Sequence, residues 1–316
     1  MNDVNKKLLR SGIFILILIV VLFSLNYRYM KSEAYFGVVE GVKPYEQGQI
    51  PEKLQIVNLG SSHSLFGIDL SLFPEYRSFS FAFTSQMLLI DSCLLTKYQN
   101  HLDEDCVVII PVSYFSYYMK ADRNITAQIP RYARILSINE FTAISWRDYI
   151  IGKYFPVCFL SKEIWKIFTY NNANSDSIYV TNDKAAVPDS LEEEGKRSSD
   201  YYKSIAGNQE VDELQAASLI NILKLCRQNN WKPVLVTTPL TRYHNKWYSS
   251  EFLDTFREQT FDLIRDFPEA VYWDYSDDDR FYDHYEYFMD SQHLNKSGQE
   301  LFTSILIEDC RNAGYL

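Results

Sequence analysis

The chain has 316 residues, of which 47% are hydrophobic and 23% charged, and its formal net charge is −10 at pH 7. These values are those of a globular protein, with enough chain for one large domain or two small ones. The acidic balance argues against nucleic acid as a partner, because binding a phosphate backbone requires a basic face.

The first predicted element is a membrane segment. Residues 11–25 carry no charge and follow Lys6, Lys7 and Arg10. A helix over these residues spans about 22 Å of a ~30 Å hydrocarbon core, so the polar residues that follow would extend it by snorkelling. The alternative is a cleaved signal peptide, but no small-x-small cleavage site follows.

The basic flank predicts a cytoplasmic N-terminus and places the rest of the chain outside the membrane. We therefore expect a single-pass protein of the cell membrane. Its predicted parts are a cytoplasmic tail (1–10), a transmembrane anchor (11–27), a stalk (28–51) and an extracytoplasmic domain (52–316).

Strand and helix signals alternate from residue 54 onward. Short apolar runs predict strands at 54–59, 78–83, 106–112, 233–238 and 271–275. Helical spacing predicts helices at 64–73, 87–102, 211–229, 251–266 and 297–309. This alternation predicts a three-layer α/β fold with an open, mostly parallel five-stranded sheet and helices on both faces.

Residues 114–210 interrupt the alternation. The segment is aromatic and helical in pattern to about residue 170, and polar from 171 to 210. We interpret it as a helical and loop insertion with a flexible stretch rather than as a separate domain. The five cysteines are scattered without zinc-ligand spacing, so we expect no metal and no other cofactor.

The first candidate for chemistry is Ser62, which follows the first predicted strand and Gly60. In open parallel sheets the site lies at the carboxyl ends of the strands. A serine on such a turn can be a nucleophile, and its backbone N–H can donate to an oxyanion. Ser61 and Ser64 are alternative nucleophiles, and a serine-rich helix cap is the plain structural interpretation.

The second candidate is the pair Asp290 and His293, directly before the last predicted helix. Their i, i+3 spacing on a turn places both side chains on one face. The carboxylate can then accept from Nδ1 and leave Nε2 free toward a serine. The structural alternative is a histidine that caps a surface loop.

Gly-x-Ser after the first strand, together with Asp-x-x-His before the last helix, resembles the SGNH/GDSL hydrolase superfamily over residues 52–316, with the insertion unmatched. Ser61 in place of the usual Asp and the N-terminal anchor resemble the membrane-anchored branch, which includes the teichoic-acid D-alanine transfer protein and polysaccharide O-acetyltransferase components. The resemblance implies a flavodoxin-like fold, a Ser62, His293 and Asp290 triad, and a polytopic membrane acyltransferase as partner.

The chain departs from that family where the oxyanion donors stand. The family supplies a Gly after the second strand and an Asn after the third, whereas residues 83–86 contain no Gly and Ser113 replaces the Asn. The candidate oxyanion and substrate-binding residues are therefore the region of Ser85 and Gln86, Ser113, and two rim residues, His63 and Tyr114.

The sequence thus predicts an extracytoplasmic serine esterase or O-acyltransferase. The expected substrate is an acylated cell-envelope glycopolymer, either teichoic acid or exopolysaccharide, processed through an acyl-serine intermediate. The alternative is a catalytically inactive SGNH-like protein that binds polysaccharide or acts as a scaffold of an envelope assembly complex.

Overall fold

The computed structural model describes residues 3–120, 125–141, 143–159 and 185–316. The chain forms two compact units: an N-terminal unit of Met1–Gly48 with Asp122–Ile178, and an α/β unit of Gln49–Ala121 with Tyr179–Leu316. The described elements of the N-terminal unit are α1 (Asp3–Tyr29), α2 (Glu33–Val39), α3 (Lys43–Glu46), η3 (Thr126–Gln128), α7 (Ile129–Ile135), α8 (Trp146–Tyr154) and η4 (Pro156–Phe159).

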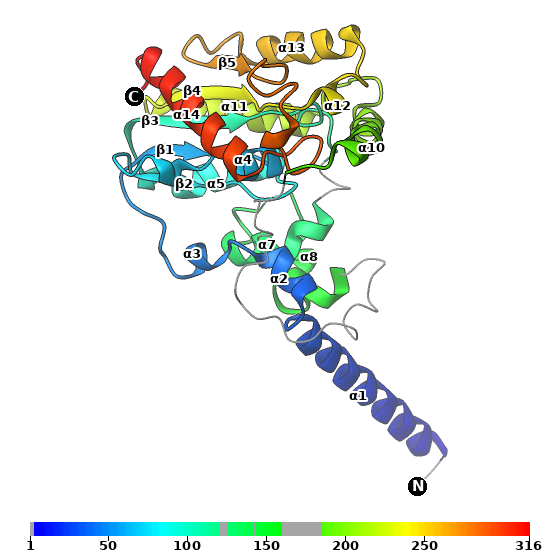
Figure 1. Cartoon of the computed structure of the whole chain (residues 1–316). Helices are drawn as coiled ribbons and strands as arrows, with labels where there is room; N and C mark the ends of the chain where they lie inside the picture. Colours follow the sequence, from blue (N-terminus) through cyan, green and yellow to red (C-terminus); the bar gives the residue numbers. More distant parts are fainter. Residues whose placement is uncertain (1–2, 121–124, 142, 160–184) are drawn as a thin grey trace. The chain divides into compact units, whose positions relative to one another are not determined.

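The α/β unit carries the sheet and the helices that cover it (Figure 1). Its strands are β1 (Leu54–Asn58), β2 (Ser78–Ser80), β3 (Leu102–Pro111), β4 (Lys232–Thr237) and β5 (Val271–Asp274). Its helices are α4 (Ser62–Gly67), η1 (Leu70–Leu72), α5 (Leu88–Tyr98), η2 (Gln99–His101), α10 (Pro188–Ala206), α11 (Glu213–Gln228), α12 (Arg242–Asn245), α13 (Ser250–Ile264), η5 (Tyr285–Tyr287) and α14 (Lys296–Asn312).

The five strands form one parallel sheet in the order β2-β1-β3-β4-β5. This confirms the predicted fold class, and the order is that of flavodoxin-like sheets. The chain moves outward from β1 to β2 and then returns to β3 on the other side of β1. The direction of winding therefore switches between β1 and β3, where the carboxyl ends of the strands open a crevice.

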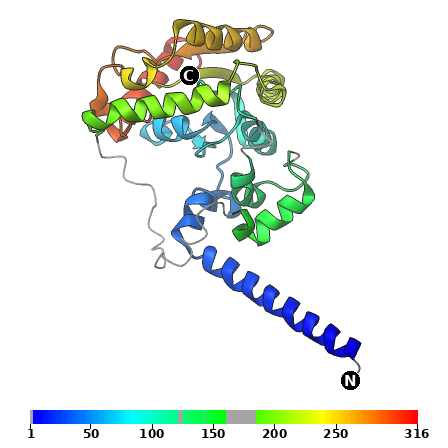
Figure 2. The same ribbon diagram turned by 90° about the vertical axis from the view of Figure 1, so that its right-hand side faces the viewer.

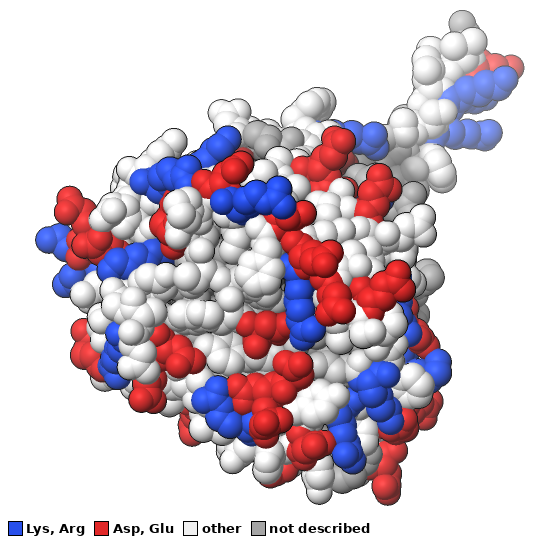
Figure 3. All heavy atoms as spheres, turned by 90° about the horizontal axis from the view of Figure 1, so that it is seen from above, with Lys and Arg blue, Asp and Glu red and all other residues white. Residues whose placement is uncertain are grey.

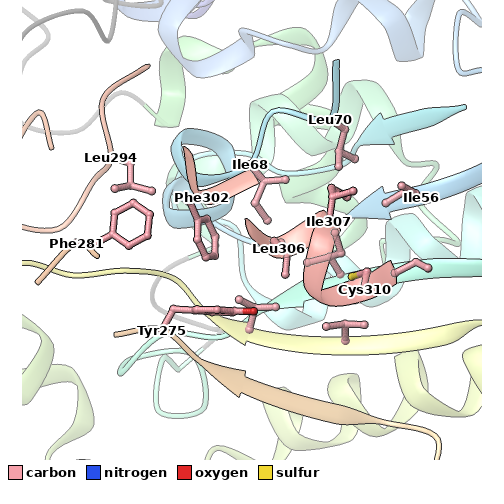
Figure 4. Packing of buried hydrophobic residues seen from close by; sticks show 14 of the residues in the cluster. Ile56, Ile68, Leu70, Tyr275, Phe281, Leu294, Phe302, Leu306, Ile307 and Cys310 are labelled. Carbon is pink, nitrogen blue, oxygen red and sulfur yellow. The ribbon is translucent and has the colours of Figure 1, made fainter. Parts of the chain in front are cut away.

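Apolar side chains on both faces of the sheet explain why the central strands β1, β3 and β4 are largely buried, whereas the edge strands β2 and β5 are half-buried. On one face, α14 contributes Phe302, Leu306 and Ile307 to a cluster that also holds Ile56 and Tyr275 (Figure 4). The opposite face is covered by α5, α11 and α13, which pack against one another and the sheet. Burial on both faces matches the continuously apolar second half of β3, residues 106–111.

The N-terminal unit holds the candidate membrane helix. Within the described ranges, α1 is the one helix that is long and apolar enough to cross a membrane. After it, Ser32 caps α2 by accepting from the Tyr35 backbone N–H at 3.3 Å. Tyr29, Tyr35 and Val157 form a small buried cluster that closes the end of α1.

Part of the polar stretch 171–210, which we predicted to be a flexible insertion, is helical in the structure. Residues 188–206 form the regular helix α10, seen as the long yellow-green helix in Figure 2, rather than flexible chain. Leu191, Gly195, Tyr202 and Ala206 are buried along one side of it. The segment is polar in overall composition, but the small and apolar residues on that side recur at helical spacing. The part of the predicted insertion at 160–184 lies outside the described residues.

Candidate active site

The nucleophile turn joins β1 to α4. Gly60 has a φ of +104°, which side-chain-bearing residues rarely adopt, and a Cβ there would lie 3.3 Å from Pro111 and from Ser64. Its N–H donates to Asp91 Oδ1 at 2.7 Å. Ser61 is the N-cap of α4, so Ser62 opens the helix. Gly60 and the buried carboxyl group of Asp91 thus hold the turn that presents Ser62.

The loop before α14 is held just as firmly. Asn295 caps α14 by accepting from the Gly298 N–H at 3.0 Å, and it donates to the Glu286 carbonyl at 2.7 Å. The Met289 N–H donates to the His293 carbonyl at 2.9 Å. Thr241 Oγ1 donates to the Ser291 carbonyl at 2.6 Å. His293 therefore sits on a braced turn rather than on a loose surface loop.

These two segments meet at the predicted residues. His293 Nε2 lies 2.9 Å from Ser62 Oγ, and His293 Nδ1 lies 2.7 Å from Asp290 Oδ2. The carboxylate receives the Nδ1–H, so Nε2 is the acceptor for the serine proton. The remaining Asp290 oxygen, Oδ1, accepts the backbone N–H groups of Gln292 and His293 at 2.9 and 2.8 Å.

These contacts set the charge of Asp290. Burial by itself would raise its pKa, but the hydrogen bond and charge of His293 and two backbone N–H groups outweigh burial and lower the pKa below its usual value. Asp290 is therefore ionised at neutral pH. An ionised carboxylate orients the imidazole and stabilises the imidazolium that forms when His293 takes a proton.

A second histidine faces the first. His63 is 4% exposed, and its ring centroid is 5.1 Å from that of His293. Burial, and then the neighbouring His293, lower the pKa of His63 to about 3, so the ring is neutral at pH 7. Its Nε2 lies 3.2 Å from Gln292 Oε1 and its Nδ1 lies 2.6 Å from Ser113 Oγ. With Nε2–H donating to Gln292, Nδ1 accepts the Ser113 hydroxyl proton.

The candidate oxyanion donors differ in whether they are free to bind an oxyanion. The Ser62 backbone N–H has no acceptor in the described part of the chain and lies at the first turn of α4, where helix dipoles favour negative charge. Ser113 Oγ lies at the site but is paired with His63. Ser85 is exposed, in a left-handed conformation with φ +58°.

Two other predicted residues lie away from the relay. The Gln86 amide donates to the Phe81 carbonyl at 2.9 Å and to Asp91 at 2.6 Å, so it supports the nucleophile turn from inside. Tyr114 is 2% exposed, and its ring packs against Tyr248 and neighbouring aromatic side chains. Tyr114 is therefore a core residue beneath α12 and α13 and does not line the rim.

Sequence analysis missed the contribution of α10. Glu194, Ser198 and Tyr202 follow one another at four-residue spacing and face the loop that carries His293. Tyr202 donates to Gln292 Oε1 at 2.6 Å, and Ser198 Oγ lies 3.3 Å from Ser291 Oγ. Burial, and then the charge of Asp290, raise the pKa of Glu194.

The packing of α10 depends on one glycine. A Cβ on Gly195 would lie 2.0 Å from the Tyr243 carbonyl oxygen, so only glycine allows this approach to α12. His244, which follows Tyr243, is fully buried between Ser198 Oγ at 2.9 Å and Tyr248 OH at 3.1 Å. The period of small residues in α10 was the available signal.

A small cavity lies behind the nucleophile turn. Its walls include Gly60, Ser61, Asp91 and Phe115. Phe115 also packs against Tyr202, with ring centroids 4.6 Å apart. Among the residues that the structure describes, no group of three His, Cys, Asp or Glu side chains is arranged to hold a metal ion.

Comparison with known proteins adds little to this geometry. No protein-family model matches the chain, and no curated protein matches it. Among solved structures, the chain is similar to one described as "a putative platelet activating factor from Streptococcus pneumonia". The two share 11% identity over 98% of this chain and 99% of the other, with a TM-score of 0.40. A likeness this weak transfers no activity, so the function is argued from the residues.

Proposed function

We propose that this protein is a membrane-anchored serine esterase or O-acyltransferase of the SGNH/GDSL type. Its proposed substrates are acyl groups of a cell-envelope glycopolymer, such as teichoic acid or an exopolysaccharide. The observation that carries the proposal is the continuous relay from Ser62 Oγ through His293 to Asp290, at 2.9 and 2.7 Å. These distances are those of an activated serine nucleophile.

In the proposed first half-reaction, Ser62 Oγ attacks the carbonyl carbon of the acyl ester while His293 Nε2 takes the hydroxyl proton. The electron pair of the C=O bond moves to oxygen, and the Ser62 N–H stabilises that oxyanion, with Ser113 Oγ turning from His63 as the second donor. Collapse breaks the ester bond. The leaving alkoxide takes the proton from His293, and the acyl group remains on Ser62.

In the second half-reaction, water or a sugar hydroxyl attacks the acyl carbon and gives its proton to His293. Collapse breaks the bond to Ser62 Oγ, which recovers its proton from His293. Water yields an esterase, and a sugar hydroxyl yields a transferase. Gln292 Oε1 is held by Tyr202 and His63, whereas Gln292 Nε2 has no hydrogen-bond acceptor in the described part of the chain. We therefore propose that Gln292 Nε2 positions the water or sugar hydroxyl that attacks the acyl carbon.

The proposed location rests on α1. An apolar helix with Lys6, Lys7 and Arg10 at its start supports an N-terminus inside and an α/β unit outside, with a polytopic acyltransferase as the proposed partner. On the face in Figure 3, acidic and basic side chains are interspersed. That face offers no continuous basic track for nucleic acid.

A fluorophosphonate probe tests the proposal on the full chain in detergent. We expect Ser62 to be labelled, with the adduct located by peptide mass spectrometry, and labelling to disappear in Ser62→Ala. Ser304→Ala, at an exposed position of α14, is the matched control and should label like the wild type.

One observation favours a second candidate, an inactive scaffold or polysaccharide-binding protein. Two of the expected oxyanion donors are paired inside the protein, Ser113 with His63 and Gln86 with Asp91. Absence of labelling in a folded sample that still binds glycan would select this candidate over the enzyme.

A further inference from the structure

The N-terminal unit carries an exposed aromatic face on α8. Trp146, Ile150 and Tyr154 are 73%, 43% and 56% exposed. Their four-residue spacing places them along one side of the helix. Single exposed apolar residues need no explanation, but a contiguous stripe marks a surface that something covers.

The opposite side of α8 packs against the rest of the N-terminal unit, so the stripe faces away from that unit. Tyr149 is 7% exposed and donates from its hydroxyl to the Leu136 carbonyl at 3.1 Å. A Cβ on Gly152 would lie 2.4 Å from Ile129 Cγ2, so α7 approaches α8 closely there. Ser145 caps the helix by accepting from the Asp148 N–H at 3.1 Å.

The end of α8 is attached to the polar end of α1. Phe155, just after α8, packs edge-on against Phe23 with ring centroids 5.1 Å apart. Asn26 Nδ2 donates to the Tyr154 carbonyl at 2.9 Å, and Asn26 Oδ1 accepts the Val157 N–H at 3.3 Å. These contacts hold the C-terminal end of α8 at the level where the uncharged stretch 11–25 of α1 ends.

The charges on α8 suit one kind of partner. At about 100° per residue, Arg147 falls beside the exposed stripe, whereas Asp148 falls away from it and accepts from the Ser145 hydroxyl at 2.7 Å. Lys153 falls on the other flank, and its ammonium donates to the Tyr149 hydroxyl at 3.2 Å. Aromatic side chains flanked by basic ones are typical of helices at the membrane–water interface.

We propose that α8 lies in the membrane interface, with Trp146, Ile150 and Tyr154 in the headgroup–acyl boundary of the leaflet from which α1 emerges. Arg147, which is exposed, reaches lipid phosphates beside the stripe. This inference rests on the membrane-spanning role of α1 in the proposed function. It assigns a second lipid contact that holds the N-terminal unit against the leaflet, beyond the single anchor.

Nitroxide accessibility tests the proposal on the full chain in nanodiscs of phosphatidylcholine and phosphatidylglycerol. A label is placed at Ile150→Cys in a Cys93→Ser, Cys158→Ser background. The matched control is Phe261→Cys on α13, which is 55% exposed in the α/β unit. We expect the Ile150 label to collide several-fold more with oxygen and several-fold less with a water-soluble nickel complex than the Phe261 label does.

Equal accessibility at Ile150 and Phe261 would overturn the proposal, because α8 would then face water. Shielding of the Ile150 label from both reagents would overturn it too, since protein rather than lipid would cover the stripe. A third label at Val20→Cys reports on α1. If the label at position 20 is exposed to water, the proposed membrane anchor and the proposed α8 contact both fail. The enzyme proposal is tested separately, by hydrolase activity.

Discussion

The two sides of the Ser62 hydroxyl are built very differently. On the side of the base, His293 and Asp290 form a complete relay, and each polar atom of the pair has its partner. On the side of the oxyanion, Ser113 is bonded to His63 and Gln86 is bonded to Asp91, so the Ser62 N–H is the donor left unpaired. In the proposed mechanism, the base is therefore in place before substrate binds, whereas stabilisation of the oxyanion requires the Ser113 hydroxyl to turn away from His63.

The neutral His63 separates these two sides. Its buried ring lies beside His293, and its low pKa keeps a second positive charge away from the imidazolium that the proposed mechanism forms on His293. The same ring accepts the hydrogen bond of the Ser113 hydroxyl through its Nδ1. Ser113, at the position where the sequence comparison led us to expect asparagine, is therefore paired with His63.

The largest expected effect is loss of the relay. Ser62→Ala and His293→Ala should each lower hydrolysis of p-nitrophenyl acetate by about 10⁴-fold or more, because nucleophile and base act together. Ser304→Ala should leave the rate unchanged. The measurement is kcat/KM on the full chain in detergent. If Ser62→Ala kept an activity within tenfold of the wild type, the relay of Ser62, His293 and Asp290 would not be the catalytic machinery.

The next effect belongs to Asp290. Asp290→Asn should lower kcat by about 10⁴-fold, since an amide favours the wrong His293 tautomer. The lowered pKa of Asp290 also links it to stability. That contribution is present above the unfolded value of about 3.9 and is lost as pH falls through the folded pKa. Denaturation by urea at pH 3 and pH 6 should show a wild-type advantage over the variant that is larger at the higher pH.

The oxyanion side is tested at Ser113. If its hydroxyl turns to the oxyanion, Ser113→Ala should lower kcat by about 10²-fold with little change in KM, because the donor acts only in the transition state. Ser71→Ala, at an exposed position of η1, is the control. An unchanged kcat would mean that the Ser62 N–H stabilises the oxyanion without the Ser113 hydroxyl. The oxyanion side would then have one donor, against the complete relay on the side of the base.

A smaller effect is expected where α10 supports the loop. Tyr202→Phe removes the hydroxyl that holds Gln292 Oε1, and a buried hydrogen bond of this kind contributes about 1 kcal/mol, or roughly fivefold in rate. Tyr201→Phe, on the exposed side of the same helix, should have no effect. Equal behaviour of the two variants in kcat/KM would show that α10 does not position Gln292.

The smallest effect on rate is expected at Asp91, where the readout is stability. Burial raises its pKa to about 7, although hydrogen bonds from Gly60 and Gln86 lower it. The folded state therefore keeps a proton that the unfolded chain loses near pH 4, so stability falls as pH rises from about 4 to 7 and stays lowered above. Asp91→Asn removes this dependence.

The urea midpoint of Asp91→Asn should accordingly exceed that of the wild type by an amount that grows between pH 4 and pH 8. Asp189→Asn, at an exposed position of α10, should give no such trend. A constant difference across this range would show that Asp91 does not titrate there, and that the nucleophile turn is held by a permanent charge.

Much of the fold could be read from local patterns. The strands β1, β3, β4 and β5 lie within one to four residues of their predicted bounds, because a buried parallel strand is a continuous apolar run that turns interrupt. β2 is shorter than predicted and ends at Ser80. The helix α10 escaped because its buried side consists largely of small and polar residues, and Tyr114 was placed at the rim because adjacency in sequence does not say which way a side chain points.

By itself, the sequence determined the α/β class, the apolar N-terminal helix and the two short segments that supply serine, histidine and aspartate. The tertiary structure alone decided that Ser62 Oγ and His293 Nε2 lie 2.9 Å apart across 231 positions of chain. It also decided that Ser113 is paired with His63 and that α10 faces the relay. Periodicity and turn chemistry act between near neighbours in the chain, whereas these pairings arise from the packing of distant segments, which no local pattern encodes.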